Sequence, residues 1–316
     1  MLKISEKLRP FSHEPGTAVL VPGSDWIVRA YPVLLRVGGE DFPLQITGPV
    51  REFTLQLDLE RDCLWVWGIA KEGHFRYKLF ASEQGLFLSL DRSPKSGFAI
   101  GNHSLKPKET ILLQSGGQFI SPSKPERFSL GNSKAQDWDL VRRRNNIFEW
   151  APVLYALAQK VPNKGDVTGG PLALLNRLEE FFPAAFEGIL VPHLTDPLHQ
   201  GLFTEEGRGN ALALLREAFQ TIRGYILDEN RILPALPADW HCGRALHLQS
   251  PFGRLDLEWT KGTLRQMVLY GEKTGEATFL FSKPIKSFRF NGERASSQQS
   301  LLIESGKKYH LDRFQK

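Results

Sequence analysis

Two stretches of the chain alternate apolar and polar residues, and a stretch with helical periodicity separates them. The first alternating stretch runs from about residue 17 to residue 120, in short segments separated by glycine, proline and aspartate. Because successive side chains of a strand point to opposite faces, this pattern predicts an antiparallel sheet with one buried face. The segments at 64–67, 75–79 and 86–90 have turn residues between them and predict a meander within a β-sandwich. The alternation is clearest at Phe53, Leu55, Leu57 and Leu59.

A change to helical periodicity follows the segment 120–125, which is rich in proline and serine. Apolar residues then recur about every 3.6 positions, which indicates a separate helical unit. The pattern predicts a helix over 137–158 with a break at Pro152, and a short helix that Pro183 ends. The clearest helix begins after Gly209. Its apolar stripe consists of Leu212, Leu215, Phe219, Ile222 and Ile226.

Alternation returns beyond Pro237 and predicts a second antiparallel β domain, most clearly at 255–259. We therefore expect a mainly β fold with some α structure. It consists of an N-terminal antiparallel β-sandwich over residues 1–133, a reduced α-helical middle unit over 134–233, and a C-terminal antiparallel β domain over 234–316.

The composition is that of an ordinary globular chain. Hydrophobic residues make up 41% and charged residues 24% of the sequence, which excludes a disordered or collagen-like chain. No apolar stretch approaches the roughly 18 residues that cross a bilayer, and residues 1–10 lack the apolar run of a secretion signal. These observations predict a cytoplasmic protein without a membrane partner.

The charge balance gives little reason to expect nucleic acid as a partner. The 40 basic residues are set against 35 acidic ones, and the one dense basic run, at 142–144, is typical of a solvated helix face. Cys63 and Cys242 are far apart in sequence and provide neither a disulfide framework nor a four-thiolate zinc site. We expect both thiols in the core of a protein from a reducing compartment, and we expect no cofactor.

The segment after the clearest helix resembles a known junction. Residues 231–240 read RILPALPADW, and residues 253–262 read GRLDLEWTKG. This order is similar to the point where the helical barrel of family 95 glycoside hydrolases, the inverting α-L-fucosidases, passes into a C-terminal β domain. The family has a LLPALP..W..G segment there, followed by a G…V.I.W.DGKL strand pair. The resemblance covers about 60 residues and leaves the first half of the chain unmatched.

The resemblance implies where the catalytic groups of such an enzyme would lie. An inverting glycosidase needs a carboxylic acid and, about 6.5–9.5 Å away, a base that activates water. The family carries FQIDGNFG just before its last barrel helix, where residues 203–210 of this chain read FTEEGRGN. Glu206 stands where the family has Asp, with Glu205 beside it, so these two carboxylates are the catalytic candidates. Arg208 replaces an Asn of the family and is a candidate ligand contact.

The length of the middle segment argues against a complete barrel. Twelve helices need on the order of 250 residues, whereas about 100 lie between residue 133 and Pro234. We therefore expect a glycoside-hydrolase-like protein with a reduced barrel, which does not catalyse and which binds carbohydrate or serves as a scaffold. Trp240 is expected either to pack at the domain interface or to contact a ligand by stacking on a sugar.

One alternative is a small glycoside hydrolase with a rebuilt site. His193 and His199 lie in one loop shortly before Glu205 and Glu206, ahead of a helix N-terminus where pKa values are readily shifted. Either histidine is a candidate ligand contact. The neighbouring prolines prevent the helical spacing of a metal-binding histidine pair, so we expect no metal.

A second alternative is a protein-interaction module. It would use exposed sheet surface, with the aromatic strand at Trp65 and Trp67 as its centre. The sequence defines neither the partner nor the oligomeric state.

Overall fold

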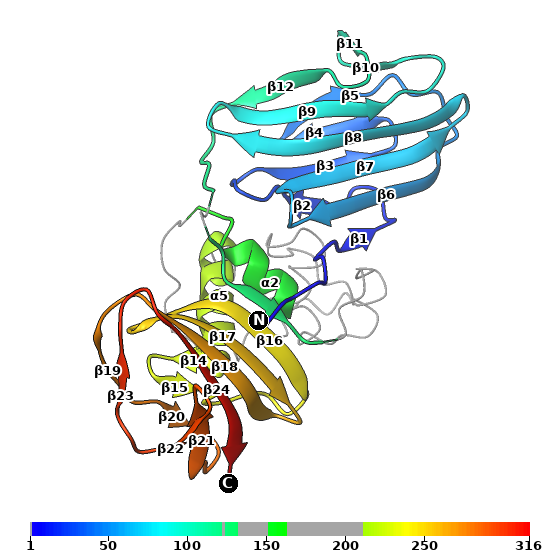
Figure 1. Cartoon of the computed structure of the whole chain (residues 1–316). Helices are drawn as coiled ribbons and strands as arrows, with labels where there is room; N and C mark the ends of the chain where they lie inside the picture. Colours follow the sequence, from blue (N-terminus) through cyan, green and yellow to red (C-terminus); the bar gives the residue numbers. More distant parts are fainter. Residues whose placement is uncertain (1, 122–123, 132–150, 163–210) are drawn as a thin grey trace, which may run out of the picture.

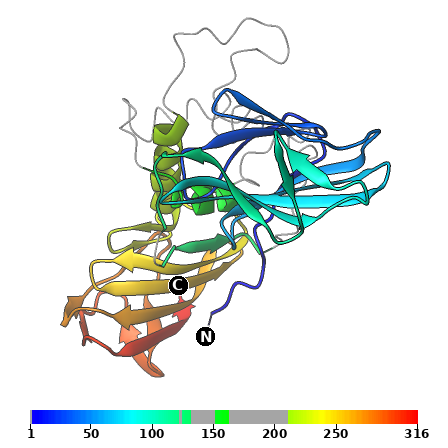
Figure 2. The ribbon, with the colours of Figure 1, turned by 90° about the horizontal axis from the view of Figure 1, so that it is seen from above.

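The computed structural model describes residues 2–121, 124–131, 151–162 and 211–316. It is mainly β with little helix, as expected. Two helices of the described part, α2 (Ala151–Ala158) and α5 (Ala211–Ile226), lie between two β units (Figure 1; Figure 2). Neither of these helices has the length and apolar character that a membrane crossing requires.

The N-terminal unit is a sandwich of two antiparallel sheets. Its strands are β1 (Phe11–Ser12), β2 (Ala18–Leu20), β3 (Ile27–Tyr31), β4 (Leu34–Val37), β5 (Glu40–Pro43), β6 (Arg51–Asp58), β7 (Cys63–Ala70), β8 (Gly73–Ser82), β9 (Gly85–Arg92) and β12 (Thr110–Ser115), with a separate hairpin of β10 (Phe98–Ile100) and β11 (His103–Leu105). One sheet has the order β1-β6-β7-β8-β9-β12 and the other β2-β3-β4-β5. The expected meander is confirmed, because β6 to β9 are neighbours in both chain and sheet.

Alternation decides which side chains fill this sandwich. In β7, Leu64 and Val66 are fully buried between the sheets, whereas Trp65 and Trp67 are partly exposed on the opposite face. Val28 and Leu35 from the smaller sheet belong to the same buried cluster. The six-stranded sheet therefore keeps one face, turned away from β2–β5, for contact with solvent or a ligand.

The C-terminal unit contains three sheets. Their strands are β13 (Arg127–Ser129), β14 (Leu227–Asp228), β15 (Arg231–Ile232), β16 (Cys242–Ser250), β17 (Gly253–Thr260), β18 (Thr263–Gly271), β19 (Gly275–Ala277), β20 (Leu280–Phe281), β21 (Ser287–Phe290), β22 (Glu293–Ser296), β23 (Leu301–Ile303) and β24 (Lys308–Gln315). The largest sheet has the order β13-β16-β17-β18-β24-β21-β22, and smaller sheets form from β14-β15-β20 and β19-β23. All these pairs are antiparallel except β15 with β20.

The two helices pack against each other through aromatic side chains. The rings of Tyr155 in α2 and Phe219 in α5 stack with centroids 4.7 Å apart. The helix expected after Gly209 is confirmed as α5, and its stripe residues Leu215 and Ile226 are fully buried. The break predicted at Pro152 stays a prediction, because this proline is the second described residue of α2 and residues 132–150 before the helix lie outside the described part of the chain. The rest of the predicted helix, 137–150, and the short helix before Pro183 lie outside the described residues.

Strand pairing crosses both expected domain boundaries. Strand β13 belongs to the expected sandwich domain, 1–133, yet it pairs with β16 of the C-terminal sheet. Strands β14 and β15 fall within the expected helical unit, 134–233, and pair with each other and with β20. The end of the middle segment, β14 and β15, is therefore tied into the C-terminal unit by backbone hydrogen bonds.

The two thiols differ in environment. Cys63 is 3% exposed, as expected for a core residue, but Cys242 is exposed, so the expectation of two core thiols is wrong for it. The reason is the period of two in β16, where Cys242 and Arg244 face outward while Gly243 and Ala245 face the core.

Candidate functional site

Most of the residues predicted to form a site lie outside the described part of the chain. These are the catalytic candidates Glu205 and Glu206 and the ligand candidates His193, His199 and Arg208. Their positions, and with them the rebuilt hydrolase site, stay predictions.

Trp240 lies in the core and not on a surface that a sugar can reach. Its side chain is 2% exposed, and its ring centroid lies 4.9 Å from that of Phe128 and 5.9 Å from that of Tyr225. The backbone carbonyl of Trp240 accepts a hydrogen bond from Trp259 Nε1 at 3.0 Å. The structure therefore supports the packing interpretation, in which the ring joins β13 and α5 to the C-terminal sheet, and corrects the expected ligand contact.

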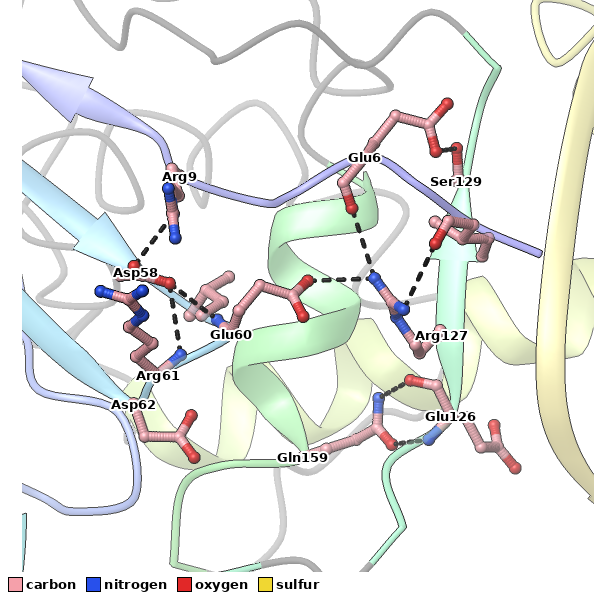
Figure 3. Close-up of polar contacts among 12 residues, drawn as sticks. Glu6, Arg9, Asp58, Glu60, Arg61, Asp62, Glu126, Arg127, Ser129 and Gln159 are labelled. Atoms are coloured by element: carbon pink, nitrogen blue, oxygen red, sulfur yellow. Dashed lines mark hydrogen bonds and ion pairs between the residues drawn. The ribbon is translucent and has the colours of Figure 1, made fainter.

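A cavity of about 250 Å³ lies where the two β units meet. We call it the junction cavity; it is lined by the N-terminal segment at 4–8, the β6–β7 turn at 59–62, β13 and α2. Figure 3 shows how its polar groups connect these segments. Arg127 donates to Glu60 Oε1 at 3.0 Å and to the backbone carbonyl of Glu6 at 3.3 Å, and the Ser129 hydroxyl donates to Glu6 Oε2 at 3.2 Å.

The other charged groups of the junction cavity are paired as well. Lys160, almost fully buried, forms an ion pair with Asp62. Glu126 is 8% exposed and accepts hydrogen bonds from the Tyr155 hydroxyl and, at 2.8 Å, from the backbone N–H of Gln249. Burial, followed by the Glu126 carboxylate, holds the pKa of Tyr155 well above its ordinary value, so its hydroxyl remains a donor. These contacts join segments of the fold, and we assign the junction cavity a structural role.

A second hollow, of about 380 Å³, lies on the outward face of the six-stranded sheet. We call it the tryptophan hollow. It is lined by Trp65 and Trp67, by the polar side chains of Gln56, Asp58 and His74, and by four arginines, Arg9, Arg61, Arg76 and Arg92.

Strand register brings the tryptophans and one of the arginines together. Trp65 lies opposite Gln56 of β6, and Trp67 lies opposite Arg76 of β8. The guanidinium carbon of Arg76 lies 4.6 Å from the centroid of the Trp65 ring, a cation–π contact that orients both side chains. Arg76 Nε also forms an ion pair with Asp91 Oδ2 at 2.7 Å. The face therefore presents flat aromatic surface beside fixed positive charge.

A buried carboxylate supports one end of the hollow. Asp58 is 2% exposed, and its Oδ2 lies 2.9 Å from Arg9 Nε. Its Oδ1 accepts hydrogen bonds from the backbone N–H groups of Glu60, at 3.1 Å, and Arg61, at 3.2 Å (Figure 3). Asp58 thereby fixes the turn that carries Arg61, and its own charge is compensated.

The charges of the tryptophan hollow do not cancel. Arg9 is paired with Asp58 and Arg76 with Asp91. Within the described part of the chain, no carboxylate forms an ion pair with Arg61 or Arg92. Two guanidinium groups therefore remain available for negatively charged ligand atoms.

Cys63 borders this face but is unsuited to nucleophilic chemistry. Burial, followed by the neighbouring Asp58 carboxylate, raises the pKa of its thiol to about 11. At neutral pH the sulfur is therefore protonated. The side chains that line the hollow provide aromatic surface, hydrogen-bonding groups and positive charge.

No known protein family matches the sequence, and no curated protein matches it as a relative. The assignment of the site accordingly depends on the geometry and chemistry of the described residues.

Sequence reasoning identified Trp65 and Trp67 as an exposed strand but missed the basic groups around them. The sequence contained a signal for two of these groups. His74 and Arg76 are spaced two residues apart, as the tryptophans are, and a short turn separates the two pairs. Aligning the two strands as a hairpin places these four side chains on one face.

Proposed function

We propose that the protein binds carbohydrate in the tryptophan hollow. The observation that carries this proposal is the pair Trp65 and Trp67, whose side chains share the outward face of β7 within a hollow of about 380 Å³. A sugar ring has apolar C–H faces and polar edges. An aromatic ring can cover the C–H face while polar side chains around it bind the hydroxyls.

The polar complement lies on the neighbouring strands. The Gln56 amide provides donors and an acceptor beside Trp65, and His74 and Arg76 provide further hydrogen-bonding groups on β8. Such mixed donors and acceptors suit hydroxyl groups, which both donate and accept.

The resemblance to family 95 glycoside hydrolases supports a carbohydrate ligand from a separate part of the chain, residues 231–262. The role that we propose is binding. The hydrolase alternative depends on Glu205 and Glu206, so it requires its own test, in which glycoside turnover disappears in Glu206→Gln.

A glycan array followed by calorimetric titration tests the proposal. We expect the wild-type protein to bind at least one oligosaccharide with millimolar or tighter affinity. We expect Trp65→Ala and Trp67→Ala each to weaken that binding about tenfold or more, because each removes a stacking surface worth on the order of 1.4 kcal/mol.

Phe87→Ala is the matched control. Phe87 lies on the outward face of the same sheet, stacked on Phe80 with ring centroids 5.6 Å apart, and it does not line the hollow. Its variant should bind as the wild type does, with far-UV circular dichroism confirming the fold of all three. Absence of binding to every glycan, or unchanged affinity in both tryptophan variants, contradicts the proposal.

A further inference from the structure

Building on the proposed function, we infer that the ligand is an acidic oligosaccharide. It has at least two sugar units with carboxylate or sulfate groups, its rings lying on Trp65 and Trp67 and its acidic groups at Arg61 and Arg92. The inference rests on the carbohydrate-binding proposal and names the class of carbohydrate.

The charge balance of the hollow is the first argument. Four guanidinium groups line it, and two of them are neutralised by Asp58 and Asp91 at 2.9 Å and 2.7 Å. Two positive charges remain, on Arg61 and Arg92. Lys78 also stands on this sheet face, opposite Trp65, but its ammonium group lies over the Phe80 ring and not in the hollow. A neutral sugar would leave these cations without a counterion in the complex, whereas an acidic sugar pairs with them.

The positions of the unpaired cations are the second argument. Arg61 belongs to the turn that precedes β7, on the Trp65 side of the hollow. Arg92 lies at the end of β9, opposite Arg76, which in turn lies opposite Trp67. Adjacent strands are about 4.8 Å apart, so Arg92 begins about 10 Å from Trp67 across the sheet. Cations on both sides of the tryptophan pair require a ligand with more than one acidic group.

The type of cation favours oxyanions. A guanidinium group presents a planar fork of donors that matches carboxylate and sulfate oxygens in pairs. Arg61 and Arg92 are both exposed, so both side chains can turn toward a ligand.

The size of the hollow favours a saccharide over single-stranded nucleic acid, which also stacks on aromatic rings beside basic groups. Nucleic-acid sites of this kind follow the backbone over about 4–16 nucleotides. The tryptophan hollow measures about 380 Å³, and the whole chain balances 40 basic against 35 acidic residues. A short acidic oligosaccharide fits this confined site.

The test is calorimetric titration of the full chain at low ionic strength with four probes. They are an oligogalacturonide, its carboxyl-reduced neutral analogue, a chondroitin sulfate tetrasaccharide and a dT oligonucleotide. We expect one or both acidic saccharides to bind at least tenfold more tightly than the neutral analogue. The oligogalacturonide and the sulfated probe distinguish carboxylate from sulfate recognition.

The variants Arg61→Gln and Arg92→Gln test whether the acidic saccharide binds at the tryptophan hollow. Each should weaken the acidic saccharide about tenfold or more and leave any neutral binding within about twofold. Lys273→Gln is the control, because it removes the same charge from an exposed position in the C-terminal unit. Raising the salt concentration should weaken the acidic complex and not the neutral one.

The outcomes separate this inference from the proposed function. Equal affinity for the neutral analogue, with wild-type behaviour of both arginine variants, overturns the inference and leaves carbohydrate binding intact. Tightest binding to the oligonucleotide overturns the inference in favour of nucleic acid. Failure to bind any saccharide overturns both.

Discussion

At the scale of single residues, Gly243 and Trp259 show how closely the C-terminal core is packed. A Cβ atom on Gly243 would lie 2.1 Å from Cζ2 of Trp259, and this tryptophan is 1% exposed. The ring is held in place, because its Nε1 donates to the backbone carbonyl of Trp240 at 3.0 Å and Phe128 lies beside it with centroids 6.2 Å apart. Position 243 therefore requires glycine, because the Trp259 ring lies too close to the backbone for any Cβ atom.

We therefore expect Gly243→Ala to lower the free energy of unfolding by about 1–3 kcal/mol or more, as overpacking does. Gly224→Ala is the matched control in α5, where an added Cβ meets nothing within 4 Å. Because alanine favours a helix over glycine, this control should raise stability by up to about 1 kcal/mol. Urea denaturation measures both changes, and equal stability of the Gly243→Ala variant and the wild type would argue against the close contact.

The two thiols differ enough to be told apart in the native protein. Cys242 is exposed and Cys63 is buried, so a thiol reagent at mild pH should label one cysteine quickly and the other after denaturation. Cys242→Ser should abolish the fast phase, and its persistence in that variant would mean that Cys63 is accessible.

The raised pKa of Cys63, about 11 against an ordinary 9.0, also predicts a pH dependence. The folded thiol keeps its proton where the unfolded one ionises, so its contribution is complete below about pH 9 and declines as the pH rises toward 11. The loss is at most about 2–3 kcal/mol. Urea titrations at pH 8 and 10.5 should show a smaller decline in Cys63→Ala than in the wild type; equal declines would exclude this cause.

At the scale of elements, the hydrophobic period predicted most of what the structure contains. Alternation marked β6 to β9, β17 and β18, because one face of each packs in a core, and the stripe of α5 marked its buried side. It did not predict that β13, three residues long, joins the C-terminal sheet, because its partner β16 is distant in sequence. Pairing of this kind is decided by tertiary contacts.

The candidate site could likewise be predicted only in part from the sequence. The tryptophan strand stood out, whereas the contributions of Arg9, Arg61 and Arg92 depend on how separate strands and a turn meet. The sequence left two roles open for Trp240, packing at the domain interface and stacking on a sugar. Its burial between helix and sheet shows that it packs.

Through its carboxylate, Glu126 joins three elements, α2, α5 and β16, and we expect its removal to destabilise the fold. Its carboxylate accepts from Tyr155 of α2, Arg223 of α5 and the backbone of Gln249 in β16. Glu126→Ala leaves these donors without their acceptor, so we expect a loss of about 3 kcal/mol in the free energy of unfolding. Glu126→Gln keeps one acceptor oxygen and should lose less. Chemical denaturation of both variants checks the order, and similar values would contradict the role of the charge.

At the scale of the whole molecule, the N-terminal segment holds the two β units together. Leu2 packs with Leu246 and Val268 on the C-terminal sheet, and the carbonyl of Leu8 accepts from the Leu59 backbone of the sandwich at 3.2 Å. Between these points, Arg127 binds both the segment and Glu60. The segment and Arg127 together couple the two units.

This coupling predicts one calorimetric unfolding transition for the wild type. Arg127→Ala should lower the midpoint temperature of this transition and broaden or split the transition, because the sandwich and the C-terminal unit then unfold more independently. Arg36→Ala is the control, since its ion pair with Asp41 joins two exposed residues of one hairpin and should contribute little. Two transitions in the wild type, or an unchanged transition in Arg127→Ala, would contradict the coupling.

The pairing of Arg127 with Leu246 has a consequence for biosynthesis. At about 5–20 residues per second, a ribosome needs roughly 6–24 s to proceed from one to the other. During that interval the sequence of the sandwich is complete, whereas the β13 segment has no partner because β16 has not yet been synthesised. Its brevity and the charges of Glu126 and Arg127 protect the emerging polypeptide from pairing with other nascent chains.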